Sequence, residues 1–291
     1  MKKVLLLTGL LVSAFQLHAQ GLSDILDDET PETKNYTTST FKGTRILNGH
    51  SIENRKKGTL DFLISHRFGS VDLGIDELFG LDQSNIRFAF EYAPIDDLTV
   101  GLGRSSNEKI YDGFFKYKLL KQSSGKQSFP FTASVFANVA YRSLNDNDLT
   151  FNQNLTYVSQ LLIARKFSTG FSLQIMPSYI SRNSVRIDDD PHGIFAIGAG
   201  ARAKITKRMA INAEYHYVTN PLESIPTTNS LALGLEIETG GHVFQIILSN
   251  SIAITERNFL TETNGDFFEG DIHLGFNIAR TFQVGNRKRK H

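Results

Sequence analysis

Three histidines fall in segments that we predict to be strands, and a serine hydrolase could be built around them. Such an enzyme needs a serine activated by a histidine that a third group orients. His216 and His273 fall on the less apolar face of their strands, and His66 falls on the apolar face near a strand end. Ser65 and Ser105 are conceivable nucleophiles, but the chain has no Gly-x-Ser-x-Gly turn and no spacing that places a serine beside a histidine. We therefore favour structural histidines and predict no enzymatic activity.

Metal and cofactor chemistry has little support in the sequence. Asp188, Asp189 and Asp190 with His192 could bind a hard cation through oxygen atoms, but their spacing matches no ligand loop. An acidic, solvated loop is the favoured interpretation. The strand histidines lack zinc-ligand spacing. The chain has no cysteine, which excludes disulfides, thiolate metal sites and cysteine catalysis. We predict no metal site and no cofactor.

Charged and imidazole side chains recur on the less apolar face of the predicted strands, among many glycines and alanines. Small residues with scattered opposite charges suit a confined polar lumen better than a solvated surface. These side chains could line an aqueous path whose selectivity comes from local charge, or they could pair and close the lumen. Both interpretations remain open. The lumen-lining candidates are Arg67, Arg87, Glu91, Lys116, Lys118, Glu214, His216, Glu236, Glu238 and His273.

The elements that position these side chains alternate between apolar and polar residues from residue 58 almost to residue 283. Alternation with period two is a strand signal, and we count twelve such runs. Many have about the ~9–11 residues that a tilted transmembrane strand needs. Short and long connections alternate, as in barrels with tight periplasmic turns and longer outer loops. Residues 103–109 are short for an outer loop, and residues 120–130 are long for a periplasmic turn.

A soluble sandwich or lipocalin-like barrel would alternate in the same way, with its apolar face inward. The apolar face of the predicted strands is nearly free of charge at the strand centres. A lysine or arginine there would cost about 2–4 kcal/mol at the midplane of a bilayer. Phenylalanine and tyrosine recur near strand ends, as in an aromatic girdle. We therefore predict an all-β, up-and-down antiparallel transmembrane β-barrel of about twelve strands, surrounded by outer-membrane lipid.

The first residues have the organisation of an export signal. Lys2 and Lys3 precede an apolar run over residues 4–15, and Ala19 is the expected cleavage point. Twelve apolar residues are too few to span ~30 Å of hydrocarbon as a helix. We predict a signal peptide at 1–19, a periplasmic N-terminal segment at 20–57, a barrel at 58–283 and a basic tail at 284–291. A net charge of +1 gives no electrostatic signature of nucleic-acid binding.

The segment 41–51 is apolar and marked by glycines, unlike its polar flanks. It precedes the first strand and so starts on the periplasmic side. It could fold into the lumen as a plug, with Phe41, Arg45 and His50 as candidate residues and Arg45 meeting lumen carboxylates. It could equally be a periplasmic linker. This segment or the basic residues 287–290 could contact a periplasmic partner, and the tail could bind anionic lipid, although a solvated tail is the default.

Several stretches resemble a family of outer-membrane β-barrel proteins of Gram-negative bacteria that is known only as a β-barrel domain of unknown function. They span most of the chain beyond the signal. The resemblance implies an exported barrel and implies no activity, substrate or catalytic residue. Many barrel chains end on an aromatic residue, whereas here Phe282 is followed by residues 283–291. The stretches are FKGTRILNGHS at 41–51, HRFG at 66–69, FGLDQSNIR at 79–87, GRS at 103–105 with YDG at 111–113, GHVFQ at 241–245 and GDIHLGFNI at 270–278.

Two classes of function remain in view besides the hydrolase. The leading hypothesis is an outer-membrane channel or binding protein for small polar solutes, with lumen charges and a plug setting access. The alternative is a non-conducting barrel that serves as a structural or partner-docking protein.

Overall fold

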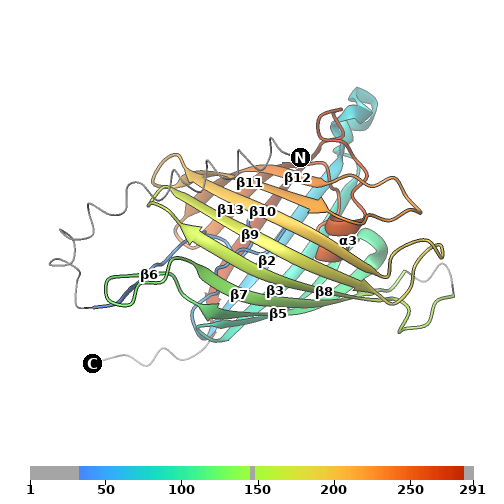
Figure 1. The fold of residues 1–291 in the computed structure, drawn as a ribbon. Coiled ribbons are helices and arrows are strands. Elements are labelled where there is room, and N and C mark those ends of the chain that lie inside the picture. Colours follow the sequence, from blue (N-terminus) through green and yellow to red (C-terminus); the bar gives the residue numbers. More distant parts are fainter. Residues whose placement is uncertain (1–32, 145–147, 285–291) are drawn as a thin grey trace, which may run out of the picture. The chain divides into compact units, whose positions relative to one another are not determined.

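Twelve strands form one closed antiparallel barrel in the computed structural model, which describes residues 33–144 and 148–284 (Figure 1). Each strand pairs with its neighbour in sequence, and the last strand pairs with the first to close the barrel. The predicted fold is therefore confirmed. The strands are β2 (Thr59–Ser70), β3 (Ser84–Ile95), β4 (Leu98–Ser105), β5 (Ile110–Leu120), β7 (Thr132–Arg142), β8 (Leu155–Lys166), β9 (Phe171–Arg182), β10 (Gly193–Lys204), β11 (Met209–Val218), β12 (Ser230–Thr239), β13 (His242–Ser249) and β14 (His273–Gln283).

Two further short strands form a separate compact unit. β1 (Asn35–Tyr36) pairs antiparallel with β6 (Ser123–Ser124), which lies in the long connection between β5 and β7. This unit comprises residues 33–37 and 122–130 of the described chain. The connection that seemed long for a periplasmic turn thus contains a strand of its own.

The strands place their apolar side chains outward and their polar side chains inward. In β3, Phe88 and Phe90 are 44% and 53% exposed, whereas the alternate residues Arg87 and Glu91 are buried. A soluble barrel would bury the apolar set instead, because that set would then form its core. The pattern therefore fits a barrel whose outer surface faces lipid.

Most connections at one end of the barrel are short turns, and most at the other end are longer. The connection between β2 and β3 contains η1 (Val71–Leu73) and η2 (Ile75–Gly80), and the one between β4 and β5 contains η3 (Asn107–Lys109). The connection between β13 and β14 contains α3 (Glu256–Thr261). None of the helices in the described ranges is long and apolar enough to cross a membrane. The predicted signal peptide and residues 287–290 lie outside the described residues.

Two segments that are not barrel strands lie against its inner face. The first, residues 38–57, is called the plug segment here; its apolar residues Phe41, Ile46, Leu47 and Ile52 are at most 2% exposed. The second is α3, in which all six residues are buried. One apolar cluster joins the plug segment to Phe114, Phe136, Leu162, Met176 and Ile247, and a second joins α3 to Val158, Ile180, Ile194 and Leu222.

Candidate functional site

The middle of the plug segment forms a tight hairpin inside the barrel. Residues 44–51 form this plug tip, in which Arg45 and His50 pair as an antiparallel bridge. The Ile46 N–H donates to the Gly49 carbonyl at 2.9 Å, and the Ser51 N–H donates to the Thr44 carbonyl at 2.9 Å. These bonds satisfy only part of the backbone, so the remaining buried polar groups need partners from the barrel wall.

Glu214 on β11 supplies the central anchor of the plug tip. Its carboxylate accepts the backbone N–H groups of Leu47, Asn48 and Gly49 at 3.0, 3.2 and 2.8 Å. Successive N–H groups in a turn form a concave site that favours an anion. The Nε2 atom of His216 lies 2.8 Å from the same carboxylate. Two predicted lumen residues therefore act together as a binding site for backbone.

Amide side chains on other strands satisfy most of the remaining plug backbone. The Gln174 amide on β9 donates to the His50 carbonyl and accepts from the Ile52 N–H, both at 2.7 Å. Asn277 on β14 donates to the Leu47 carbonyl at 2.7 Å, and Gln245 on β13 donates to the Ile46 carbonyl at 2.8 Å. The wall thus presents neutral hydrogen-bonding groups where the plug tip lies.

Two glycines of the wall leave room for the apolar residues of the plug tip. A Cβ atom at Gly200 on β10 would overlap the Ile46 side chain, and one at Gly234 on β12 would overlap the Leu47 side chain. The small residues that the sequence places on the lumen face are therefore needed for close packing of the plug segment. Any larger side chain at these positions would compete with the plug for the same space.

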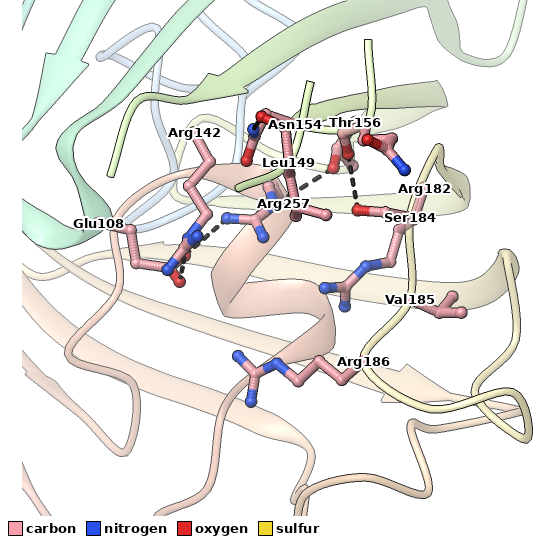
Figure 2. Close-up of a pocket in the computed structure, with 11 residues that line it drawn as sticks. Glu108, Arg142, Leu149, Asn154, Thr156, Arg182, Ser184, Val185, Arg186 and Arg257 are labelled. Carbon is pink, nitrogen blue, oxygen red and sulfur yellow. Dashed lines mark hydrogen bonds and ion pairs between the residues drawn. The ribbon is translucent and has the colours of Figure 1, made fainter. Parts of the chain in front are cut away.

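The α3 helix is held at the outer end by arginine–glutamate pairs (Figure 2). Arg257 donates to Glu108 at 2.6 Å, and the Asn258 amide donates to the same carboxylate at 2.8 Å. Burial favours the neutral acid, but Arg257 and the hydrogen bonds from Asn258, Arg257 and Arg142 outweigh it and lower the pKa of Glu108 to about 2. At the end of the helix, Arg182 donates to Glu262 at 2.9 Å.

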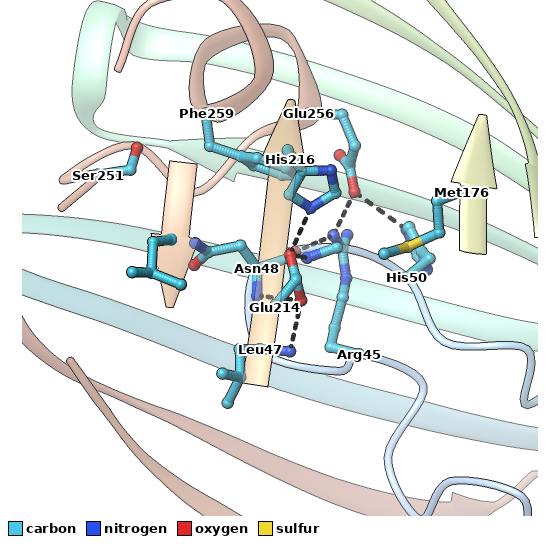
Figure 3. A network of polar contacts seen from close by, with 12 residues as sticks. Arg45, Leu47, Asn48, His50, Met176, Glu214, His216, Ser251, Glu256 and Phe259 are labelled. Carbon is cyan, nitrogen blue, oxygen red and sulfur yellow. Dashed lines mark hydrogen bonds and ion pairs between the residues drawn. The ribbon is translucent and has the colours of Figure 1, made fainter. Parts of the chain in front are cut away.

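The two inserted segments meet near the middle of the lumen (Figure 3). Arg45 forms an ion pair with Glu256 of α3, and its Nε atom lies 3.9 Å from Glu91 on β3. The His50 ring packs between Phe114 and Phe136, with centroids 4.5 and 4.3 Å away. The lumen is therefore occupied from both ends.

Seven of the ten predicted lumen residues are buried on the inner face. They are Arg67, Arg87, Glu91, Lys116, Glu214, His216 and Glu236. The other three, Lys118, Glu238 and His273, are half-buried near strand ends. Several of the buried residues bind the plug segment; for example, Lys116 donates to the Ser51 and Glu53 carbonyls and Arg67 donates to the Asn48 side chain. The structure brings most of the predicted set around the plug.

Pairing partners inside the lumen include residues that sequence analysis missed. Arg87 binds Asp112 through two bonds of 2.9 and 2.5 Å, and Arg202 binds Glu236 at 2.8 Å and Glu238 at 3.0 Å. Asp112 and Arg202 follow the same alternation as the predicted lumen residues, so parity alone could have found them. Glu256 lies in α3, within an outer connection whose sequence has no strand period that would mark it.

The residues considered for catalysis and metal binding make structural contacts. Ser105 donates to Asn85 at 3.1 Å, and the His273 ring lies 3.0 Å from the Phe68 carbonyl. Asp190 accepts the N–H groups of Glu223 and Ser224 at 2.9 and 2.8 Å, which fixes a loop. In the part of the chain that the structure describes, no group of three or more His, Asp or Glu side chains is arranged to hold a metal ion. The absence of enzymatic activity stays a prediction.

Comparison with known proteins identifies the family. Residues 41–282 match the family described as a membrane bound beta barrel domain (DUF5777), so the chain belongs to it and the predicted resemblance is confirmed. The protein is a β-barrel of the outer membrane. No curated protein sequence matches the chain.

Solved structures of other outer-membrane barrels are similar to the chain. One is the KdgM porin in complex with disordered oligogalacturonate, which is 8% identical, covers 77% of this chain and 99% of its own, and has a TM-score of 0.47. Another is the COG4313 outer membrane channel from Pseudomonas putida F1, with 13% identity, coverages of 79% and 98%, and a TM-score of 0.43. At these identities the likeness concerns the barrel alone.

Proposed function

We propose that this protein is an outer-membrane channel for small polar solutes, closed in the conformation described here by the plug segment and α3. The observation that carries the proposal is the chemistry of the wall around the plug tip. The wall binds the plug with Glu214, Gln174, Gln245 and Asn277, which would all need water as a partner if the plug segment left.

A barrel that is permanently filled can close its interior with apolar side chains. Here the plug is neither a strand of the sheet nor held by a disulfide, because its backbone bonds mainly to side chains of the wall and the chain has no cysteine. Twelve strands lie between filled barrels of ~8 strands and open porins of ~16. A lumen without the plug segment would be lined by charged and amide groups, which suit hydrated solutes.

The alternative of a non-conducting barrel is favoured by one observation. Phe41, Ile46 and Leu47 pack with Phe114 and Phe136 in an apolar cluster that spans the inside of the wall. Burial of this size stabilises the closed state, since each fully buried large side chain contributes roughly 1.5–3 kcal/mol. Release of the plug segment from the lumen must overcome this free energy of burial.

Conductance in a planar bilayer separates the two functions. We expect the mature protein, residues 20–291, to conduct weakly and a variant that lacks residues 20–55 to conduct more, because the deletion removes the plug tip. Heat-modifiable migration on SDS gels, in which a folded barrel migrates differently before and after boiling, is the control for folding of both proteins. Unchanged conductance from a folded, inserted deletion variant would contradict the plug, and silence from both proteins would support a non-conducting barrel.

A further inference from the structure

A pocket of about 570 Å³ opens beside α3 at the outer end of the barrel (Figure 2). It lies between the helix, the end of β7, the start of β8 and the end of β9. Four arginines line it, and Figure 2 shows their guanidinium groups turned toward one space. These are Arg142, Arg182, Arg186 and Arg257. A volume of this size is typical of sites for small molecules.

Positive charge exceeds negative charge among the described residues of this pocket. Glu108 binds Arg142 at 2.9 Å and Arg257 at 2.6 Å. Glu262 binds Arg182 at 2.9 Å and lies 3.6 Å from Arg257. Because Glu262 is shared between Arg182 and Arg257, the described residues on this side of the pocket carry more positive than negative charge.

Two of the arginines have donors that the protein does not fully use. The Arg182 side chain is 5% exposed, and its buried Nη1 atom has no hydrogen-bond partner. Arg186 is 45% exposed, and its nearest carboxylate, Glu262, is 3.8 Å away. A buried donor without a partner is costly, and the planar arginine fork matches the oxygen pair of a carboxylate or phosphate.

We infer that this pocket binds an anionic solute through its carboxylate or phosphate oxygens. Arg182 and Arg186 supply the unused donors, while Thr156 and Asn154 offer neutral polar groups beside them. Thr156 and Arg182 occupy the inward face of β8 and β9, so a solute reaches them from the lumen mouth rather than from the lipid. That the bound anion is the cargo of the channel rests on the function proposed above, whereas the binding itself does not.

The test measures binding to the full mature protein in detergent by titration calorimetry, with citrate and inorganic phosphate as probes and glucose as the uncharged comparison. We expect citrate and phosphate to bind and glucose not to bind. Arg182→Gln and Arg186→Gln should each weaken binding by about tenfold or more, because each loses a charge-assisted bond. Arg186 is half exposed, so its variant folds even where loss of Arg182 disturbs the barrel.

Arg208→Gln is the matched control, because it removes the same charge from an exposed turn at the opposite end of the barrel. Absence of citrate and phosphate binding at millimolar concentrations, or equal weakening by Arg208→Gln, would overturn the inference. Arginine-dependent binding only to micelles that contain lipopolysaccharide would assign the pocket to a lipid headgroup and would also overturn it. Citrate binding by a protein that never conducts would support the anion site and contradict the proposed channel. Conduction without citrate or phosphate binding would support the channel and contradict the anion site.

Discussion

The plug tip and α3 close the same lumen, but different forces hold them. The plug tip is bound through its backbone by Glu214 and neutral amides, and its side chains fit beside Gly200 and Gly234. The α3 helix is bound through charged side chains, chiefly the Glu108–Arg257 pair, and through the ring of Phe259. The buried Arg45–Glu256 ion pair links the two.

This difference indicates that salt and acid should affect the contacts of α3 more than those of the plug tip. The carboxylate of Glu214 and the packed side chains of the plug tip are buried, so salt screens these contacts little. Ion pairs near the outer end weaken in salt and when a carboxylate is protonated. We therefore expect the outer closure to loosen under conditions that leave the plug tip in place.

The largest effect should follow from Glu214→Ala. Three buried N–H groups of the plug tip would lose their acceptor, at about 1–3 kcal/mol for each unsatisfied group. Hydrogen exchange of residues 44–51 should accelerate by at least about tenfold, and conductance should rise. Glu214→Gln keeps an acceptor oxygen and should have a smaller effect. Exchange of residues 44–51 in Glu214→Ala equal to that in the wild type would show that the carboxylate does not anchor the tip.

Packing of the plug tip is tested by Gly234→Val. The new side chain would occupy the space of Leu47, and overpacking of this kind costs about 1–3 kcal/mol. We expect higher conductance from a barrel of unchanged strand content. Gly240→Val is the control, because a Cβ atom there meets no other atom within 4 Å. A closed Gly234→Val barrel would mean that Leu47 does not seal the lumen.

Acid should act on the outer closure through Glu108. Its pKa is lowered from 4.5 to about 2, so its ionised form stabilises the folded loop at pH values above 4.5. That contribution is lost as the pH falls from about 4.5 to about 2, when the carboxylate takes up a proton and releases Arg257. Pepsin should then cleave the connection 250–272 faster in the wild type toward pH 2. A Glu108→Gln variant should already be cleaved fast at pH 4.5. If cleavage of this variant still accelerates between pH 4.5 and pH 2 as much as in the wild type, another group causes the loosening.

Salt should have the smallest effect. Partly exposed pairs such as Arg186–Glu262 contribute about 0–1 kcal/mol and are screened by ions. Between about 0.05 M and about 1 M NaCl, hydrogen exchange over residues 256–262 should rise by a few-fold while exchange over residues 44–51 stays constant. A parallel change in both segments would remove the distinction between them.

Sequence alone predicts the barrel well because the pleat imposes a period of two on every strand. That period also places Arg87, Glu214 and Glu236 on the inner face. Whether such residues pair could not be predicted, since pairing depends on strands that are not adjacent in the sheet. Arg87 on β3 reaches Asp112 on β5 across β4, where Gly103 leaves its guanidinium room.

The loop contributions to the site carry no comparable signal. Glu256 and Arg257 lie in an outer connection with no period, so nothing in the sequence places them in the lumen. The plug segment was recognisable from its apolar residues and glycines, but a linker explained those equally well. Its position depends on glycines of β10 and β12, more than 140 residues later in the chain.

That separation has a consequence for biogenesis. Lys116 on β5 and Arg67 on β2 bind the plug tip early in the chain, but Gln174, Glu214, Gln245 and Asn277 lie on β9, β11, β13 and β14. This larger part of the binding wall exists only after the C-terminal strands have paired. Contacts between residues so distant along a chain carry a large entropic cost of loop closure before they form. If the plug closes the channel as proposed, this closure is completed together with the seam between β14 and β2.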